Sequence, residues 1–108
     1  MAKKYPYILA IDTSCDDTSV AVTQGVRALS NIVASQEEIH RKYGGVMPLE
    51  AKLAHHEFID ATFKEALKRA HLQLEQIEAI AVTQGPGLAI ALEVGITFAK
   101  QLALETHK

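Results

Sequence analysis

The stretch ILAIDTSCDDTSVAV, residues 8–22, places a short polar turn between two apolar segments. The continuous apolar run at residues 7–13 predicts a buried strand. Val20 and Val22 would share one face of an extended segment, which predicts a second strand at 18–23. The turn between them contains Asp12, Asp16 and Asp17 together with hydroxyls and a thiol. Ordinary hairpins need only Asn-Gly or Asp-Gly, so this composition indicates a turn with a further task.

The composition is typical of one soluble, cytoplasmic domain. The chain has 108 residues, 48% of them hydrophobic, and a mean hydropathy of +0.05, which suffices for a single core. A net charge of -2 argues against a strongly basic nucleic-acid surface. Cys15 is the single cysteine, which excludes an internal disulfide and fits a reducing compartment. No apolar run has the length of a membrane span, and residues 1–5 do not resemble a signal peptide.

Four further elements are predicted beyond this turn. Residues 27–35 fit a third strand, residues 50–71 an amphipathic helix, residues 77–83 a fourth strand and residues 88–105 a second helix. The near-continuous apolarity of the fourth strand favours coverage on both faces. Residues 36–48 read as a short helical or irregular stretch and a loop. The apolar stripes of the two helices are Ala54, Phe58, Ile59, Thr62, Phe63, Ala66, Leu67 and Ala70, then Leu92, Ile96, Ala99, Leu102 and Ala103.

The order β-β-β-α-β-α is that of an α/β, ribonuclease-H-like (actin-like ATPase) half domain with a mixed sheet. Such a half domain has strand order 3-2-1-4-5, with one more strand and helix after the last ones here. We therefore expect residues 1–108 to be an N-terminal subdomain that is truncated before that strand and helix. The fourth strand would then lie at an open edge, which favours self-association.

The first turn has two interpretations on its composition. In actin-type folds this turn approaches phosphates or a metal, because backbone N–H groups and hydroxyls converge there. Alternatively, Asp12 and Thr13 end a strand, Asp16 or Asp17 forms an Asx-turn, and the hydroxyls bond the loop backbone. Composition leaves both interpretations open.

Three segments resemble the N-terminal signatures of the Kae1/TsaD family. They are ILAIDTSCDDTSVAV, then SQEEIHRKYGGVMP followed by His55, then IEAIAVTQGPGLAIALEVGITFAKQLA. The resemblance implies transfer of a threonylcarbamoyl group from threonylcarbamoyl-AMP to N6 of the tRNA adenosine next to the anticodon. Family proteins are much longer, so the resemblance implies an N-terminal fragment that is inactive alone. The ligands of the family's divalent metal, iron or zinc, and its adenine-nucleotide loops are expected outside this chain.

The resemblance also implies roles for individual residues. Asp16 and then Asp17 are the candidate catalytic residues, because they match the acidic pair of the family's first loop. Thr13, Ser14 and Cys15 match the neighbouring positions, and Gly85 and Gly87 match a strand-to-helix turn; all five are candidate nucleotide-binding residues. Cys15 is expected to be a small packed thiol rather than a nucleophile. The glycines either permit close approach of a ligand before a helix N-terminus or serve a turn that needs φ > 0.

No metal ligand is assigned within this chain. His40 and His55 match family histidines, but without a second close ligand they are expected to make loop hydrogen bonds. Leu49, Leu53 and Ile90 depart from the family pattern, which leaves the polar contacts at the start of the first helix in question.

The resemblance implies partners and leaves alternatives. tRNA and threonylcarbamoyl-AMP would be the substrates of the full-length enzyme, and TsaB-like and other threonylcarbamoylation proteins its partners, with no membrane. The nearest alternative is a non-catalytic TsaB-like scaffold protein of the same fold, which also opens with ILAIDTS. SCDD and GPGLAIALEVG favour the catalytic family. An actin-type sugar or acid kinase lobe is a wider alternative, and a metallopeptidase lacks its HExxH motif.

Overall fold

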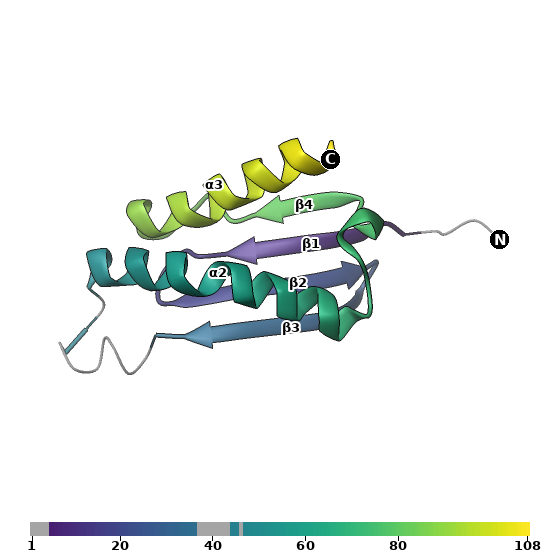
Figure 1. Cartoon of the computed structure of the whole chain (residues 1–108). Helices are drawn as coiled ribbons and strands as arrows, with labels where there is room; N and C mark the ends of the chain where they lie inside the picture. The colour runs from purple at the N-terminus through teal and green to yellow at the C-terminus, as the bar shows by residue number, and fades with distance from the viewer. Residues whose placement is uncertain (1–4, 37–43, 46) are drawn as a thin grey trace.

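Four strands and two long helices follow one another in the predicted order (Figure 1). The structure, a computed structural model, describes residues 5–36, 44–45 and 47–108. Its elements are β1 (Tyr7–Asp12), β2 (Asp17–Gln24), β3 (Arg27–Ser35), α2 (Pro48–Ala70), the 3-10 helix η1 (Leu74–Gln76), β4 (Ala79–Val82) and α3 (Ala89–Thr106). Most of the predicted irregular segment at 36–48, His40 included, lies outside the described residues.

The strands form one mixed sheet in the order β3-β2-β1-β4. β2 is antiparallel to both β1 and β3, whereas β4 is parallel to β1, with Ile11 opposite Val82. The predicted order is thus confirmed for these four strands. Because β1 and β4 run in the same direction, the loops that follow them meet at the same edge of the sheet.

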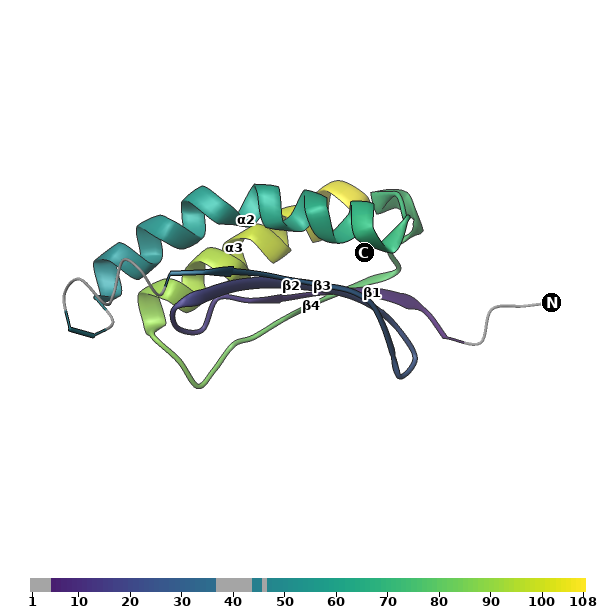
Figure 2. The same ribbon diagram turned by 90° about the horizontal axis from the view of Figure 1, so that it is seen from below.

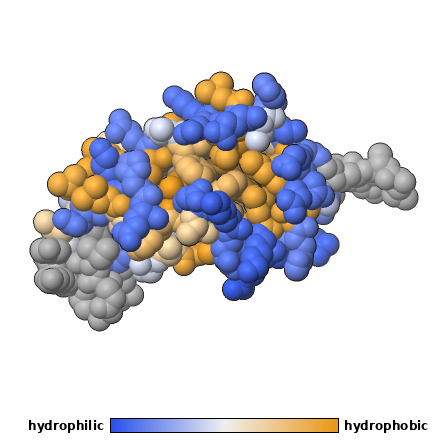
Figure 3. Space-filling model, viewed as in Figure 1, coloured by the Kyte–Doolittle hydropathy of each residue, from blue (hydrophilic) through white to orange (hydrophobic). Residues whose placement is uncertain are grey.

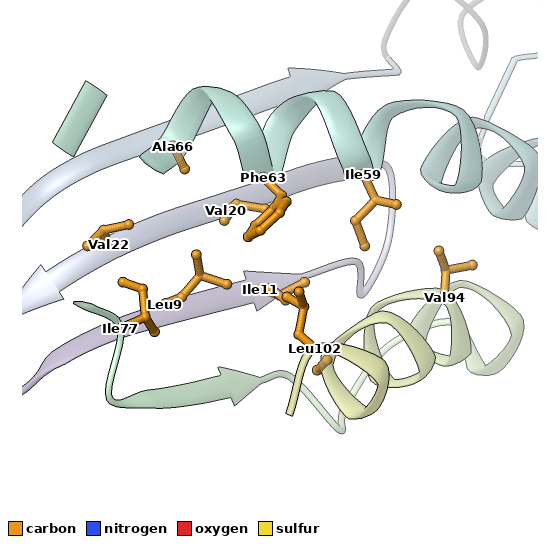
Figure 4. Close-up of a cluster of buried hydrophobic side chains, with 11 residues drawn as sticks. Leu9, Ile11, Val20, Val22, Ile59, Phe63, Ala66, Ile77, Val94 and Leu102 are labelled. Atoms are coloured by element: carbon orange, nitrogen blue, oxygen red, sulfur yellow. The ribbon is translucent and has the colours of Figure 1, made fainter. Parts of the chain in front are cut away.

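Both helices cover the same face of the sheet (Figure 2). The side chains on this face of β1 and β2 are Leu9, Ile11, Val20 and Val22, all 2% exposed or less. They pack against Ile59, Phe63 and Ala66 of α2, Val94, Ala99 and Leu102 of α3, and Ile77 (Figure 4). Phe63 and Phe98 join the two helices by an edge-to-face contact with ring centroids 5.4 Å apart. Burial of this apolar face fixes the helices on the sheet.

The expectation that β4 is covered on both faces is wrong. Ile80 lies beside Leu9 and shares its helix-covered face, whereas Ala79 and Ala81 lie on the opposite face, where no helix packs in the described structure. The small size of these alanines makes the strand apolar throughout although only one side is covered. In α3, Ile96 and Ala103 of the expected stripe are only half-buried, because they line a groove along the free edge of β4.

Apolar side chains also reach the surface on the helical face, between charged groups (Figure 3). Leu49 and Leu53, near the start of α2, are 61% and 54% exposed, so the departures from the family pattern there do not disturb the core. No helix in the described part of the chain is long and apolar enough to cross a membrane.

The free edge of β4 is expected to make the 108-residue chain self-associate at micromolar concentration. Residues 79–82 carry no charge or proline that would oppose pairing with another strand. Ala81→Lys places a charge on an exposed position of this edge and should shift the chain toward monomer in light scattering. Ala28→Lys, on the other edge strand, is the matched control. A wild-type chain that stays monomeric would contradict this prediction.

Candidate functional site

Two loops meet at the carboxyl ends of β1 and β4. Loop A, defined here as residues 12–18, comprises the end of β1, the turn after it and the start of β2; loop B, residues 83–88, joins β4 to α3. The Leu88 N–H donates to the Ser14 carbonyl oxygen at 2.8 Å. A Cβ atom at Gly87 would lie 2.5 Å from the same oxygen, so glycine is required for this contact. Gly85 and Gly87 do not have positive φ, and the φ > 0 interpretation is therefore wrong; Gly87 permits close approach of loop A.

Thr13 ties loop A to α3. Its hydroxyl donates to the Ala91 carbonyl at 2.7 Å and accepts from the Gly95 N–H at 3.1 Å, so it lies between two groups that a regular helix would join. Gly95 leaves room for this contact, since a Cβ atom there would meet the hydroxyl at 2.7 Å. Thr13 is 1% exposed, and the structure directs its hydroxyl toward the protein interior.

Asp12 shapes the start of loop A. One of its carboxylate oxygens accepts a hydrogen bond from the Ser14 N–H at 3.1 Å, which is an Asx-turn. The alternative in which Asp16 or Asp17 forms this turn is therefore wrong. The main chain of Asp16 is held from another element, because its carbonyl oxygen accepts from the Gln36 N–H at 3.1 Å.

In the described part of the chain, the side-chain carboxylates of Asp16 and Asp17 make no contact that holds loop A in place. Both residues are half-buried, and neither side chain has a hydrogen bond or ion pair with another described residue. Cys15 is exposed, so the expectation of a packed thiol is wrong. Loop A is held in place by hydrogen bonds of its main chain and of the Asp12 and Thr13 side chains. The Asp16 and Asp17 side chains and the thiol remain available to a ligand.

His55, on α2, holds loop A by hydrogen bonds. It is fully buried on α2, where its Nε2 donates to the Cys15 carbonyl at 2.9 Å and its Nδ1 accepts from the Thr18 hydroxyl at 2.6 Å. The expected hydrogen bond to the loop is present, although His55 itself lies in a helix. Because a carbonyl only accepts, the proton is on Nε2. Burial lowers the pKa of His55 below 6.5, against the opposing effects of the Cys15 carbonyl and of Asp12, Asp16 and Asp17.

The lowered pKa of His55 predicts an acid-sensitive fold. The unfolded chain takes up a proton at a higher pH than the folded chain, so the free energy of unfolding should fall as the pH drops below about 6.5. The loss continues until the pH passes the folded-state pKa. Denaturant titrations of wild type and His55→Gln across this range measure it, because glutamine does not titrate. Parallel curves for the two proteins would show that His55 titrates alike in both states.

The described residues do not fit a metal ion. Across residues 5–36, 44–45 and 47–108, no three His, Cys, Asp or Glu side chains converge in a way that could hold one. The three carboxylates of loop A do not form such a group, and the ring nitrogens of His55 already have partners. The chemistry open to this site is that of carboxylates and backbone N–H groups beside a helix N-terminus.

Residues 27–108 match the profile of the family described as TsaD, tRNA N6-adenosine threonylcarbamoyltransferase. The chain belongs to the TsaD family. It is 53% identical over 106 residues to the tRNA N6-adenosine threonylcarbamoyltransferase of Staphylococcus haemolyticus, and 48% identical over 101 residues to that of Thermosipho africanus. These alignments cover 97% and 94% of this chain but only 31% of each relative. The chain thus corresponds to less than a third of the length of these TsaD proteins.

Among solved structures, YeaZ from Pseudomonas aeruginosa is similar, with a TM-score of 0.74 over 95% of this chain and 41% of that chain. The sequence identity is 22%, so this likeness shows the fold alone. It confirms the ribonuclease-H-like architecture.

Sequence reasoning missed the residues that hold loop A in place. Gln36, Thr18 and Gly95 were not singled out, and His55 was not recognised as the common partner of Thr18 and Gln36. One signal was present: His55 lies on the stripe of α2 that also contains Ala51, Ile59 and Thr62, so a buried histidine was predictable from the helical period. Its partners, 19 to 40 positions away in the chain, were not.

Proposed function

We propose that residues 1–108 are the N-terminal subdomain of a tRNA threonylcarbamoyltransferase, and that loops A and B form one wall of its donor cleft. The observation that carries this is the 53% identity over 106 residues to a protein named for that activity, which includes both loops. No observation favours the TsaB-like scaffold alternative over the enzyme. A tRNA substrate is consistent with a cytoplasmic protein.

The proposed reaction needs a base or a positioning group beside the attacking amine. N6 of the adenosine forms a bond to the carbamoyl carbon of threonylcarbamoyl-AMP, the bond from that carbon to the phosphate oxygen breaks, and AMP leaves with the electron pair. The proton lost from N6 passes to a carboxylate. Asp16 is our first candidate for this role and Asp17 the second, because their side chains are uncommitted within the described protein.

We assign the phosphate group of threonylcarbamoyl-AMP to the edge of the sheet where loops A and B contact each other. α3 begins at Ala89, and its N-cap residue Leu88 offers no side-chain hydrogen bond, so the first-turn N–H groups favour an anion. Ser14, Cys15, Gly85 and Gly87 border this edge in our proposal. Thr13 contributes by holding loop A on α3, since its hydroxyl is already used there.

The remaining requirements of the reaction are assigned to other parts of a longer protein. The divalent metal proposed for the family finds no ligand set among the described residues, so no step here depends on it. TsaB-like and other threonylcarbamoylation proteins are the proposed partners. The 108-residue chain alone is expected to transfer nothing, because it supplies only one side of the cleft.

A chimeric enzyme tests this function. This chain replaces the matching N-terminal part of the Staphylococcus haemolyticus relative, and modified adenosine in tRNA is quantified by mass spectrometry with the donor and partner proteins present. We expect a rate within about tenfold of the relative, a difference of ~1.4 kcal/mol in the barrier. A chimera that melts cooperatively but forms no modified adenosine contradicts the proposal. If the isolated 108-residue chain turned over as fast as the chimera, the proposal that the chain forms only one wall of the donor cleft would be contradicted.

A further inference from the structure

A buried polar cluster connects three separate parts of the chain: loop A, Gln36 after β3, and α2. His55, which is 0% exposed, contacts Cys15 at 2.9 Å and Thr18 at 2.6 Å, and the Gln36 side-chain amide lies 3.3 Å from its Nδ1. The same Gln36 amide is 3.4 Å from the Ala51 carbonyl, one turn earlier on α2. Buried polar groups without partners are costly, so each contact constrains the others.

These contacts lie immediately before and after Asp16 and Asp17 in the sequence. The Cys15 carbonyl precedes the pair and accepts from His55, and the Thr18 hydroxyl follows it and donates to His55. Gln36 adds a third restraint through its main-chain N–H, which donates to the Asp16 carbonyl at 3.1 Å. The backbone on both sides of the two carboxylates is therefore fixed to α2 and to the end of β3.

We infer that His55 is a positioning residue for threonylcarbamoyl transfer, which holds loop A in the conformation that presents Asp16 to the reacting amine. This inference rests on the function proposed above. His55 cannot touch the substrate, because it is fully buried. It acts through the backbone of Cys15 and the hydroxyl of Thr18. A small displacement of a catalytic group can cost two orders of magnitude in rate, so the restraint matters for turnover.

Only the uncharged imidazole satisfies the cluster. With the proton on Nε2, Nδ1 accepts from Thr18 and faces the Gln36 amide; a second proton on Nδ1 would place donors against each other at that 3.3 Å contact. The charged groups that act on the ring are Asp12, Asp16 and Asp17, all from loop A, and they favour protonation. Burial outweighs them and lowers the pKa of His55. Acidification should therefore release the loop.

Two substitutions separate positioning from packing. His55→Leu has a similar volume without hydrogen bonds, whereas His55→Gln keeps one donor and one acceptor and has no charge at any pH. In the chimeric enzyme we expect His55→Leu to lower kcat about 100-fold with KM for tRNA unchanged, and His55→Gln to remain within about fivefold of wild type near neutral pH. Wild-type kcat should fall only once the pH passes the lowered pKa of folded His55, which lies below 6.5, and His55→Gln should lack this limb.

Measurements on the 108-residue chain complete the test. The ¹⁵N shifts of the His55 ring should report an Nε2–H tautomer that persists below pH 6.5, and exchange of the Gln36 amide hydrogen should accelerate in His55→Leu. If His55→Leu does not fold, the comparison of wild type with His55→Gln decides. The inference is overturned by an unchanged acid limb in His55→Gln or by wild-type kcat in a folded His55→Leu. A folded chimera without transfer activity would refute the proposed function, whereas accelerated exchange of the Gln36 amide in His55→Leu would still show that His55 holds loop A. A fully active Asp16→Asn chimera would leave the proposed function standing and would overturn the inference, because no Asp16 carboxylate would need to be presented.

Discussion

Asp16→Asn in the chimeric enzyme is expected to lower the single-turnover rate of transfer by about 10²- to 10⁴-fold, the typical contribution of a general base. Asparagine has nearly the same shape but cannot accept the N6 proton. The Asp16 carboxylate bonds no described residue, so the melting temperature should not change. Rapid-quench assays with mass spectrometry of the tRNA and thermal melting measure the two effects.

Asp60→Asn is the matched control for this substitution. Asp60 is an exposed α2 residue whose only side-chain partner in the described structure is Lys64, at 2.8 Å, so the same change of charge should leave the rate unaltered. Asp17→Asn should give a smaller loss than Asp16→Asn. Activity of Asp16→Asn within a few-fold of wild type would show that loop A is structural and that its carboxylates do not serve the reaction.

Gly87→Ala is expected to destabilise the chain by about 1–3 kcal/mol, the usual cost of overpacking. The added Cβ atom would lie 2.5 Å from the Ser14 carbonyl oxygen and 2.8 Å from its Cβ, so loops A and B must separate. The hydrogen bond from Leu88 to Ser14 should weaken as a result. Denaturant unfolding of the 108-residue chain measures the stability, and transfer by the chimera should fall with it.

The control is Gly85→Ala, two positions earlier in loop B. Nothing lies within 4 Å of a Cβ atom at Gly85, and its φ is not positive, so alanine should change the stability by less than about 0.5 kcal/mol. Equal stabilities for Gly87→Ala and Gly85→Ala would refute the contact between the two loops.

Local patterns predicted the secondary structure well because burial imposes its period on the sequence. The third strand was placed at 27–35 as observed, and the stripe through Ile59, Phe63 and Ala66 marked the buried face of α2. β4 shows the limit of such patterns. Ala79 and Ala81 look apolar whether or not they are covered, so the sequence could not distinguish one covered face from two.

The sequence drew attention to the residues of loop A but not to the residues that hold the loop in place. Loop A was recognisable because its carboxylates and hydroxyls exceed what a turn needs. Which Asp makes the Asx-turn, and whether Cys15 is packed or exposed, depends on the path of the backbone, which composition does not determine. The His55 contacts join positions 37 and 40 residues apart, so only the folded chain reveals them.

The exposed thiol of Cys15 offers the most direct test of the claim that loop A lines the donor cleft. Cys15 adjoins Asp16 and is the only cysteine of this chain, so peptide mapping can follow its alkylation in the chimeric enzyme. We predict that a non-hydrolysable analogue of threonylcarbamoyl-AMP slows alkylation of Cys15, with a midpoint equal to the Kd of the analogue measured by calorimetry. An alkylation rate that stays constant while the analogue is bound would contradict the placement of loop A at the donor.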